Sequence, residues 1–210
     1  MKLRIAILLL ATSTLAFSQT TKATDHKPAE KKSAAPAAAM PAMPTVSEEQ
    51  AKLAKIFKGS WTVTGKTEAG PNGPAETATG TEKNFIGPGK FSLLTDTNMK
   101  FSRMGPFQGH GVMYWDPETK NYTGTWCDNL GPCATQGIGQ WEGDNLVFNS
   151  EMKMGGQTSK MRQTYSKITP NSFRFTMEMG DPSGALQPWM TLDFKRAGAA
   201  APAAAEAAKK

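Results

Sequence analysis

The stretch that decides the fold comprises residues 107–141 and reads FQGHGVMYWDPETKNYTGTWCDNLGPCATQGIGQW. Two runs within it, residues 109–115 and 121–127, are rich in aromatic and β-branched residues, which favour strands. Between them lie residues 116–120, in which Asp and Pro favour a tight turn. The pattern predicts a β-hairpin.

A third strand-like run follows the hairpin. It covers residues 134–141 and is separated from the second run by a turn at residues 128–132. The three runs together predict an antiparallel meander that carries both cysteines of the chain.

Alternation with a period of two continues on both sides of the meander, which indicates further strands. These segments are residues 61–66, 76–86, 91–101, 146–154, 161–165, 173–179 and 190–194. A sheet with one apolar face must pack on a second layer or close on itself, and the sequence offers no layer of helices. We therefore predict an all-β, up-and-down antiparallel barrel of about ten strands, wide enough for a ligand.

One short helix is predicted before the first strand. Ser47 is suited to cap it, with Gln50 three residues on, and Leu53 and Phe57 follow at helical spacing before Gly59. We expect this helix to act as a lid or plug on the barrel.

The N-terminus has the pattern of an export signal. Lys2 and Arg4 precede an apolar run at residues 5–17, which is shorter than the roughly twenty residues that span a bilayer. We expect residues 1–18 to be a signal peptide cleaved near Ser18, and the mature protein to be periplasmic or secreted.

Two further segments are poor in large apolar residues. Residues 19–45 and 197–210 are rich in Ala, Pro and Lys and are predicted to be disordered, which leaves residues 46–196 as one domain. The net charge of +6 is shared with these tails, so the domain itself is nearly neutral. We expect a monomer that binds no nucleic acid, with a Lys-bearing linker that can contact an anionic envelope surface weakly.

Cys127 and Cys133 are the two cysteines of the chain. Thiols oxidise in an exported protein, so a disulfide bond is the first interpretation, and a pair of ligands for a soft metal is the alternative.

Residues near the two ends of the domain resemble the lipocalin and calycin signature. Gly59 and Trp61 follow the short helix, and Lys195 and Arg196 end the last strand. The resemblance implies that Arg196 covers Trp61 at the barrel base through a cation–π contact.

The domain also resembles a calycin-like family of exported bacterial proteins known as domain of unknown function 1579. The residues that carry this resemblance are 111–116, Tyr122, Trp126, Asp128, 173–179 and 194–196. The pair Cys127 and Cys133 departs from the usual pattern of that family. Because the family has no established activity, the resemblance implies a fold rather than a function.

The residues offer no convincing catalytic site, so we do not expect an enzyme. His110 is the one histidine of the domain, and strand parity places it on the face opposite Met113. A haem iron held by His110 inside the barrel, as in nitrobindin-like proteins, would need this parity reversed. Asp116 and Asp144 lie in predicted turns, which explains them without chemistry.

Methionine pairs in the later strands admit two interpretations. Met152 with Met154, and Met177 with Met179, point their thioethers to one side of a strand and could hold Cu(I). Because Met also lines adaptable apolar interiors, we favour lining over copper.

The sequence thus predicts an exported barrel that binds a small hydrophobic ligand in its interior, without a cofactor. The alternative is an envelope interaction or structural module whose barrel is filled by its own side chains. The predicted lining residues are Trp61, Phe91, Leu93, Met113, Trp126, Phe148, Met152, Phe175, Met177 and Met190.

The proposed bond between Cys127 and Cys133 can be tested by thiol labelling. The denatured, unreduced exported protein is expected to give no free-thiol signal, because both sulfurs are bonded. Two reactive thiols would exclude the bond and restore the metal interpretation.

Overall fold

The computed structural model describes residues 43–70, 73–154, 157–180 and 184–198. The predicted signal peptide, nearly all of the predicted linker and most of the C-terminal tail lie outside these residues. No helix among them is long and apolar enough to cross a lipid bilayer.

The described residues form one α-helix, one short 3-10 helix and a series of strands. The elements in chain order are α1 (Glu48–Phe57), β1 (Gly59–Thr67), β2 (Glu76–Ile86), a short 3-10 helix (Pro88–Lys90), β3 (Leu93–Phe101), β4 (Gly105–Asp116), β5 (Asn121–Asp128), β6 (Gly131–Thr135), β7 (Ile138–Glu142), β8 (Asn145–Met154), β9 (Gln157–Thr169), β10 (Ser172–Gly180) and β11 (Leu186–Arg196).

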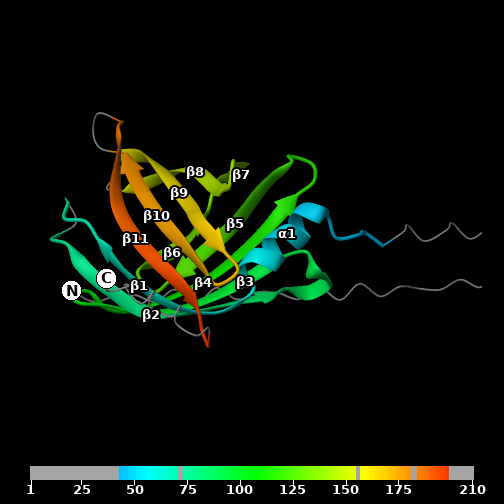
Figure 1. Ribbon diagram of the computed structural model, residues 1–210. Coiled ribbons are helices and arrows are strands. Elements are labelled where there is room, and N and C mark those ends of the chain that lie inside the picture. Colours follow the sequence, from blue (N-terminus) through cyan, green and yellow to red (C-terminus); the bar gives the residue numbers. More distant parts are fainter. Residues whose placement is uncertain (1–42, 71–72, 155–156, 181–183, 199–210) are drawn as a thin grey trace, which may run out of the picture. The chain divides into compact units, whose positions relative to one another are not determined.

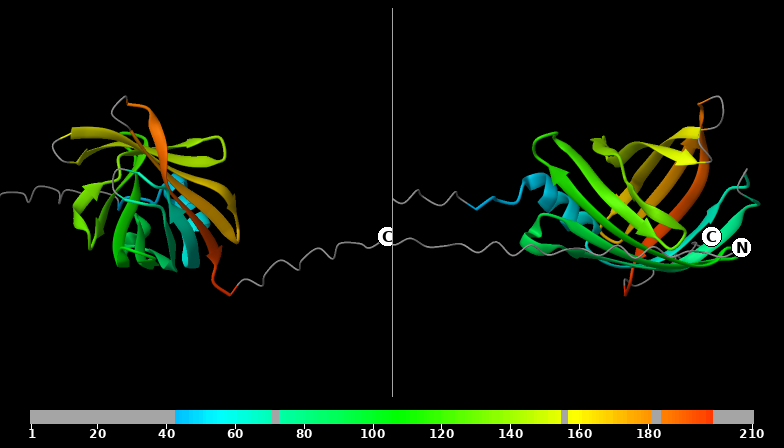
Figure 2. Two further views of the ribbon diagram at one scale, coloured as in Figure 1. Left: turned by 90° about the vertical axis from the view of Figure 1, so that its left-hand side faces the viewer. Right: turned by 180° about the vertical axis from the view of Figure 1, so that it is seen from behind.

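The strands form a closed antiparallel wall (Figure 1). Sequential strands pair along the wall, β11 returns to pair with β1, and β4 pairs with β5. β6 branches from β5, so the barrel itself has ten strands, as predicted. The views in Figure 2 show the strong twist of this wall and place α1 at one end of it.

The chain that pairs with β5 is broken into two short strands, β6 and β7. The sequence predicted one continuous strand there, over residues 134–141. β6 pairs with one half of β5 through Thr135, and β7 pairs with the other half through Gly139. Gly137 between them has a φ of +87°, and a Cβ there would lie 2.3 Å from the Asn149 carbonyl oxygen. The strand therefore breaks at Gly137, and the neighbouring Gln136 is buried.

The helix α1 closes one end of the barrel, as expected of a plug. Ser47 caps it by accepting a hydrogen bond from the Gln50 N–H at 3.1 Å, and Leu53 and Phe57 enter the core. Polar contacts fix it further, because Gln50 Oε1 accepts from the Trp115 N–H at 2.8 Å. Tyr122 donates from its hydroxyl to Glu49, and Lys52 Nζ lies 3.9 Å from the centre of the Trp141 ring.

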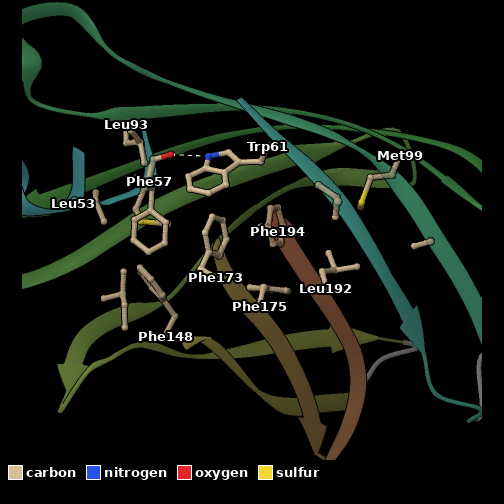
Figure 3. Packing of buried hydrophobic residues seen from close by; sticks show 14 of the residues in the cluster. Leu53, Phe57, Trp61, Leu93, Met99, Phe148, Phe173, Phe175, Leu192 and Phe194 are labelled. Atoms are coloured by element: carbon tan, nitrogen blue, oxygen red, sulfur yellow. Dashed lines mark hydrogen bonds between the residues drawn. The ribbon is translucent and has the colours of Figure 1, made fainter. Parts of the chain in front are cut away.

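The core is a cluster of aromatic and aliphatic side chains that point inward from facing strands (Figure 3). Trp61 is fully buried and packs edge-on against Phe173 with ring centres 4.8 Å apart. Phe173 in turn stacks on Phe194 at 4.3 Å, and Phe57 meets Phe173 edge-on at 5.1 Å. This packing ties α1, β1, β10 and β11 together.

The base of the barrel has the predicted cap. The Arg196 guanidinium lies 4.2 Å from the centre of the Trp61 ring and donates to the carbonyl oxygens of Lys58 and Pro170, at 2.9 and 2.8 Å. The Trp61 indole N–H donates to the Phe57 carbonyl oxygen at 2.9 Å (Figure 3). Gly59 leaves room for the guanidinium, since a Cβ there would lie 2.3 Å from Arg196 Nη1.

A disulfide bond joins Cys127 of β5 to Cys133 of β6, in agreement with the first interpretation of the sequence. It spans the short turn between these strands, so it fastens β6 to the wall. The chain-entropy estimate for such a short loop is roughly 2 kcal/mol of stabilisation.

The packing at Gly59 can be tested with a matched pair of variants. Gly59→Ala and Gly73→Ala both place a side chain at a φ near +140°, but the space around Gly73 is open. We expect Gly59→Ala to lower the free energy of unfolding by about 1 to 2 kcal/mol more than Gly73→Ala, because Arg196 must leave its hydrogen bond and its ring contact. Urea denaturation measures both values, and equal losses would contradict the proposed role of Gly59.

Candidate functional site

A cavity of about 30 Å³ lies inside the barrel, between α1 and the strands that surround it. Its walls combine aromatic and aliphatic side chains with polar ones. The lining residues are Phe57, Glu82, Asn84, Leu93, Thr95, Gly111, Val112, Met113, Trp126, Gln136, Tyr165 and Phe173.

The polar side of the cavity is built on β2 and β3, whose register places Glu82 beside Thr97 and Asn84 beside Thr95. Glu82 Oε1 accepts a hydrogen bond from Asn84 Nδ2 at 2.9 Å, and Glu82 Oε2 accepts from the Thr97 hydroxyl at 2.9 Å. Asn84 Oδ1 accepts in turn from the Thr95 hydroxyl at 2.6 Å. These hydrogen bonds run from Thr95 to Asn84, and from Asn84 and Thr97 to Glu82. The Glu82 carboxyl group is therefore the last acceptor of the network.

Glu82 is a partly exposed ionisable group on the inner side of the barrel, where apolar and polar side chains meet. Burial raises the pKa of its carboxyl group above the ordinary value of 4.5, and the hydrogen bonds from Asn84 and Thr97 offset part of that rise. Burial also raises the pKa of the Tyr165 hydroxyl, and the charge of Glu82 adds to this effect. The charge of Glu82 therefore acts on the other titratable group of the cavity.

Trp126 forms an aromatic wall because its neighbours on β4 are glycines. A Cβ on Gly109 would lie 2.2 Å from the Trp126 ring, and a Cβ on Gly111 would lie 3.0 Å from it. The ring is held in place by its N–H, which donates to Asp128 Oδ2 at 3.0 Å. Phe107 stacks nearby, with ring centres 6.4 Å apart.

Gln136 reaches the cavity from the break between β6 and β7. Its side chain is only 7 % exposed, and its Oε1 has no hydrogen-bond partner among the described residues. A Cβ on Gly124 would lie 2.7 Å from this oxygen, so glycine at that position makes room for the amide.

The structure gathers some of the predicted lining residues around the cavity and leaves others away from it. Leu93, Met113 and Trp126 line the cavity itself. Others contribute to the core without lining it: Trp61, Phe148 and Phe175 are buried, and Met177 and Met190 are half-buried against them. Arg196 lies at the base with Trp61.

Two predicted lining residues have different positions from those expected. Phe91 is 41 % exposed, because it precedes β3 and follows the short 3-10 helix, where its ring covers Gly89. The strand alternation that placed Phe91 inside begins only at Leu93. Met152 is half-buried near the end of β8, outside the core cluster.

The alternatives of haem at His110 and Cu(I) at the methionine pairs gain no support from the geometry. His110 Nδ1 lies 2.7 Å from Asp96 Oδ1 on the outer face, where both side chains are about half exposed, so the expected parity is confirmed. Met177 packs against the core, and the side chain of Met154 is outside the described part. No group of three or more His, Cys, Asp or Glu side chains arranged to hold a metal ion occurs among the described residues.

Sequence reasoning missed Glu82, Asn84, Gln136 and Tyr165 as parts of the site. The signal for the first two was present, since Lys83 between them must reach water and therefore turns its neighbours inward. Gln136 gave no such signal, because the break beside it depends on contacts with β8.

The closed wall, the capping helix and the contact of Arg196 with Trp61 define a calycin-like β-barrel, a class of fold that can hold small ligands. The chain belongs to the family described as "Protein of unknown function (DUF1579)", whose model matches residues 45–196. No curated protein shows significant sequence similarity to the chain.

Three solved structures are similar to this chain at low sequence identity. Rv2717c from M. tuberculosis is 12% identical with a TM-score of 0.52, and the match covers 72% of this chain and 99% of that one. The S-type phycobiliprotein lyase CPES from Guillardia theta is 11% identical with a TM-score of 0.48, covering 73% and 97%. A fluorescence-activating β-barrel designed de novo is 14% identical with a TM-score of 0.39, covering 68% and 95%. At such identity the likeness to Rv2717c shows the fold alone.

The burial of Glu82 predicts a dependence of stability on pH. Because its pKa is higher in the folded than in the unfolded state, folding binds protons between the two values, and the free energy of unfolding falls as pH rises from about 4.5 through the folded-state pKa. Glu82→Gln removes this contribution. Urea denaturation of both proteins across this range is expected to show the parent losing stability relative to the variant.

The exposed Glu118 provides the control for this measurement. Glu118→Gln removes one carboxylate from the surface, so it controls for the loss of a negative charge as such. A constant stability difference between parent and Glu82→Gln throughout the range would contradict the raised pKa.

Proposed function

We propose that this protein is an exported binding protein whose barrel interior takes a small, largely apolar molecule. The observation that carries the proposal is an interior cavity where apolar walls meet a fixed polar group. Phe57, Met113 and Trp126 supply apolar surface, and Glu82 with its hydrogen-bond donors supplies the polar end. Small-molecule sites typically combine mostly apolar walls with a few placed polar groups.

The small size of the cavity sets the conditions for binding. Ligand sites are typically about 300 to 1,000 Å³, whereas this cavity measures about 30 Å³. Binding would therefore require side chains to move, and Met113 is suited to this because methionine is unbranched and changes rotamer readily. The polar group of the ligand occupies the present cavity, and its apolar part displaces Met113.

The same small volume favours the second candidate function, an envelope interaction or structural module with a filled barrel. In that case the Phe and Leu side chains of the core serve stability, and the tails beyond the domain connect it to partners. Both candidates place the mature protein in the periplasm or outside the cell, on the basis of the signal-like residues 1–18. Neither candidate is an enzymatic role.

The two candidates can be separated with a cavity-filling substitution. If the interior adapts to a ligand, Met113→Trp should occupy that space and abolish binding of the neutral fluorescent probe N-phenyl-1-naphthylamine, with little loss of stability. Met177→Trp is the matched control, because Met177 is half-buried but does not line the cavity. This control should retain probe binding.

A filled barrel gives the opposite result. The parent would then bind no probe, and Met113→Trp would lower the free energy of unfolding by about 1 to 3 kcal/mol through overpacking. Native mass spectrometry of the protein purified from its own cells provides an independent check, since a retained ligand appears as added mass.

A further inference from the structure

The cavity offers more hydrogen-bond acceptors than the protein itself satisfies. An ionised carboxylate has about four lone-pair sites, and Glu82 uses two of them for Asn84 and Thr97. Neither Lys nor Arg is present among the described residues that line the cavity. The open sites on Glu82 are therefore available to a donor from outside the chain.

Gln136 provides a second, independent observation. Its Oε1 is buried without a partner among the described residues, and Gln136 is one of the residues that line the same cavity as Glu82. A buried polar atom without a hydrogen bond is costly, and such atoms in a native protein require an explanation. A ligand that donates hydrogen bonds supplies that explanation for Gln136 and Glu82 together.

The aromatic walls add a preference for positive charge. Rings of Phe57, Trp126, Tyr165 and Phe173 surround the cavity. The face of an aromatic ring attracts cations, and this attraction strengthens where water is excluded. A carboxylate, a free amide oxygen and aromatic rings together suit a compact cation with several N–H donors.

We propose that the ligand carries a protonated primary amine, which binds to the Glu82 carboxylate and to the Gln136 amide oxygen; this inference rests on the proposed function. A cavity needs about 10 to 15 Å³ to hold one water molecule. An ammonium group is similar in size to a water molecule, so the cavity of about 30 Å³ accommodates it. The apolar part of the ligand then lies along Leu93 and the displaced Met113, which line the same cavity. The barrel is thus a receptor for amphiphilic amines.

The test compares three probes that share one alkyl chain and differ in head group: n-octylamine, n-octanol and n-octanoate. Their affinities for the folded protein are measured by titration calorimetry at neutral pH, below the concentrations at which they aggregate. We expect octylamine to bind at least about tenfold more tightly than octanol, which matches the usual strength of a hydrogen bond to a charged group. Octanoate should bind most weakly, because its charge repels Glu82.

The outcomes separate the inference from the proposed function. Equal binding of octylamine and octanol would overturn the inference and leave the proposed function standing; the cavity would then hold ordered water against Glu82 and Gln136. Binding of none of the three probes would overturn both. The comparison needs no variant, so it does not depend on the folding of a mutant.

Variants then test whether Glu82 is the residue that gives the preference for octylamine over octanol. Glu82→Gln keeps the shape of the side chain and should bring octylamine to within about twofold of octanol, because the charge-assisted part of the hydrogen bond is lost. Glu118→Gln removes a surface carboxylate from the turn between β4 and β5 and should keep the selectivity of the parent. Selectivity that survives in Glu82→Gln would place the amine elsewhere and overturn the assignment.

Discussion

The contact between Arg196 and Trp61 lies at the seam where the barrel closes, and it joins that seam to the helix that plugs the barrel. An up-and-down barrel exists only if its last strand returns to its first, and Arg196 is the final residue of β11. Its guanidinium joins three segments, since it covers the Trp61 ring and donates to carbonyl oxygens at Lys58 and Pro170. Trp61 in turn holds the C-terminal end of α1 through the Phe57 carbonyl oxygen. The seam of the wall and the plug thus meet at one buried ring.

Within this frame, the placement of a carboxyl group on the inner face of β2 is costly. An apolar residue at position 82 would avoid the free-energy cost of desolvating a carboxylate, which is also what raises the pKa of Glu82. The chain instead surrounds Glu82 with donors from Asn84 and Thr97, and leaves the amide oxygen of Gln136 without a partner among the described residues nearby. Natural proteins depart from the rules of a well-packed core mainly where function requires it.

The sequence predicted the wall of this barrel better than its contents. Period-two alternation placed β2 over residues 76–86, as found, because strand formation depends on residues close in sequence. The parity of His110 and the contact of Arg196 with Trp61 were likewise correct. Phe91 was wrong, since hydrophobicity alone does not show where a turn ends. The break at Gly137 depends on the position of β8, and no local pattern encodes that.

The branch formed by β6 has a consequence for how copies of this protein meet one another. Among the described residues β6 pairs only with β5, so its other side is a free edge, and all five of its residues are exposed. Free edges invite strands from other chains, which is a common route to aggregation. Here the edge is short, Pro132 lacks the N–H that an incoming strand would need, and Cys133 is bonded to the wall. The free edge of β6 is therefore a poor template for pairing with a strand of another molecule.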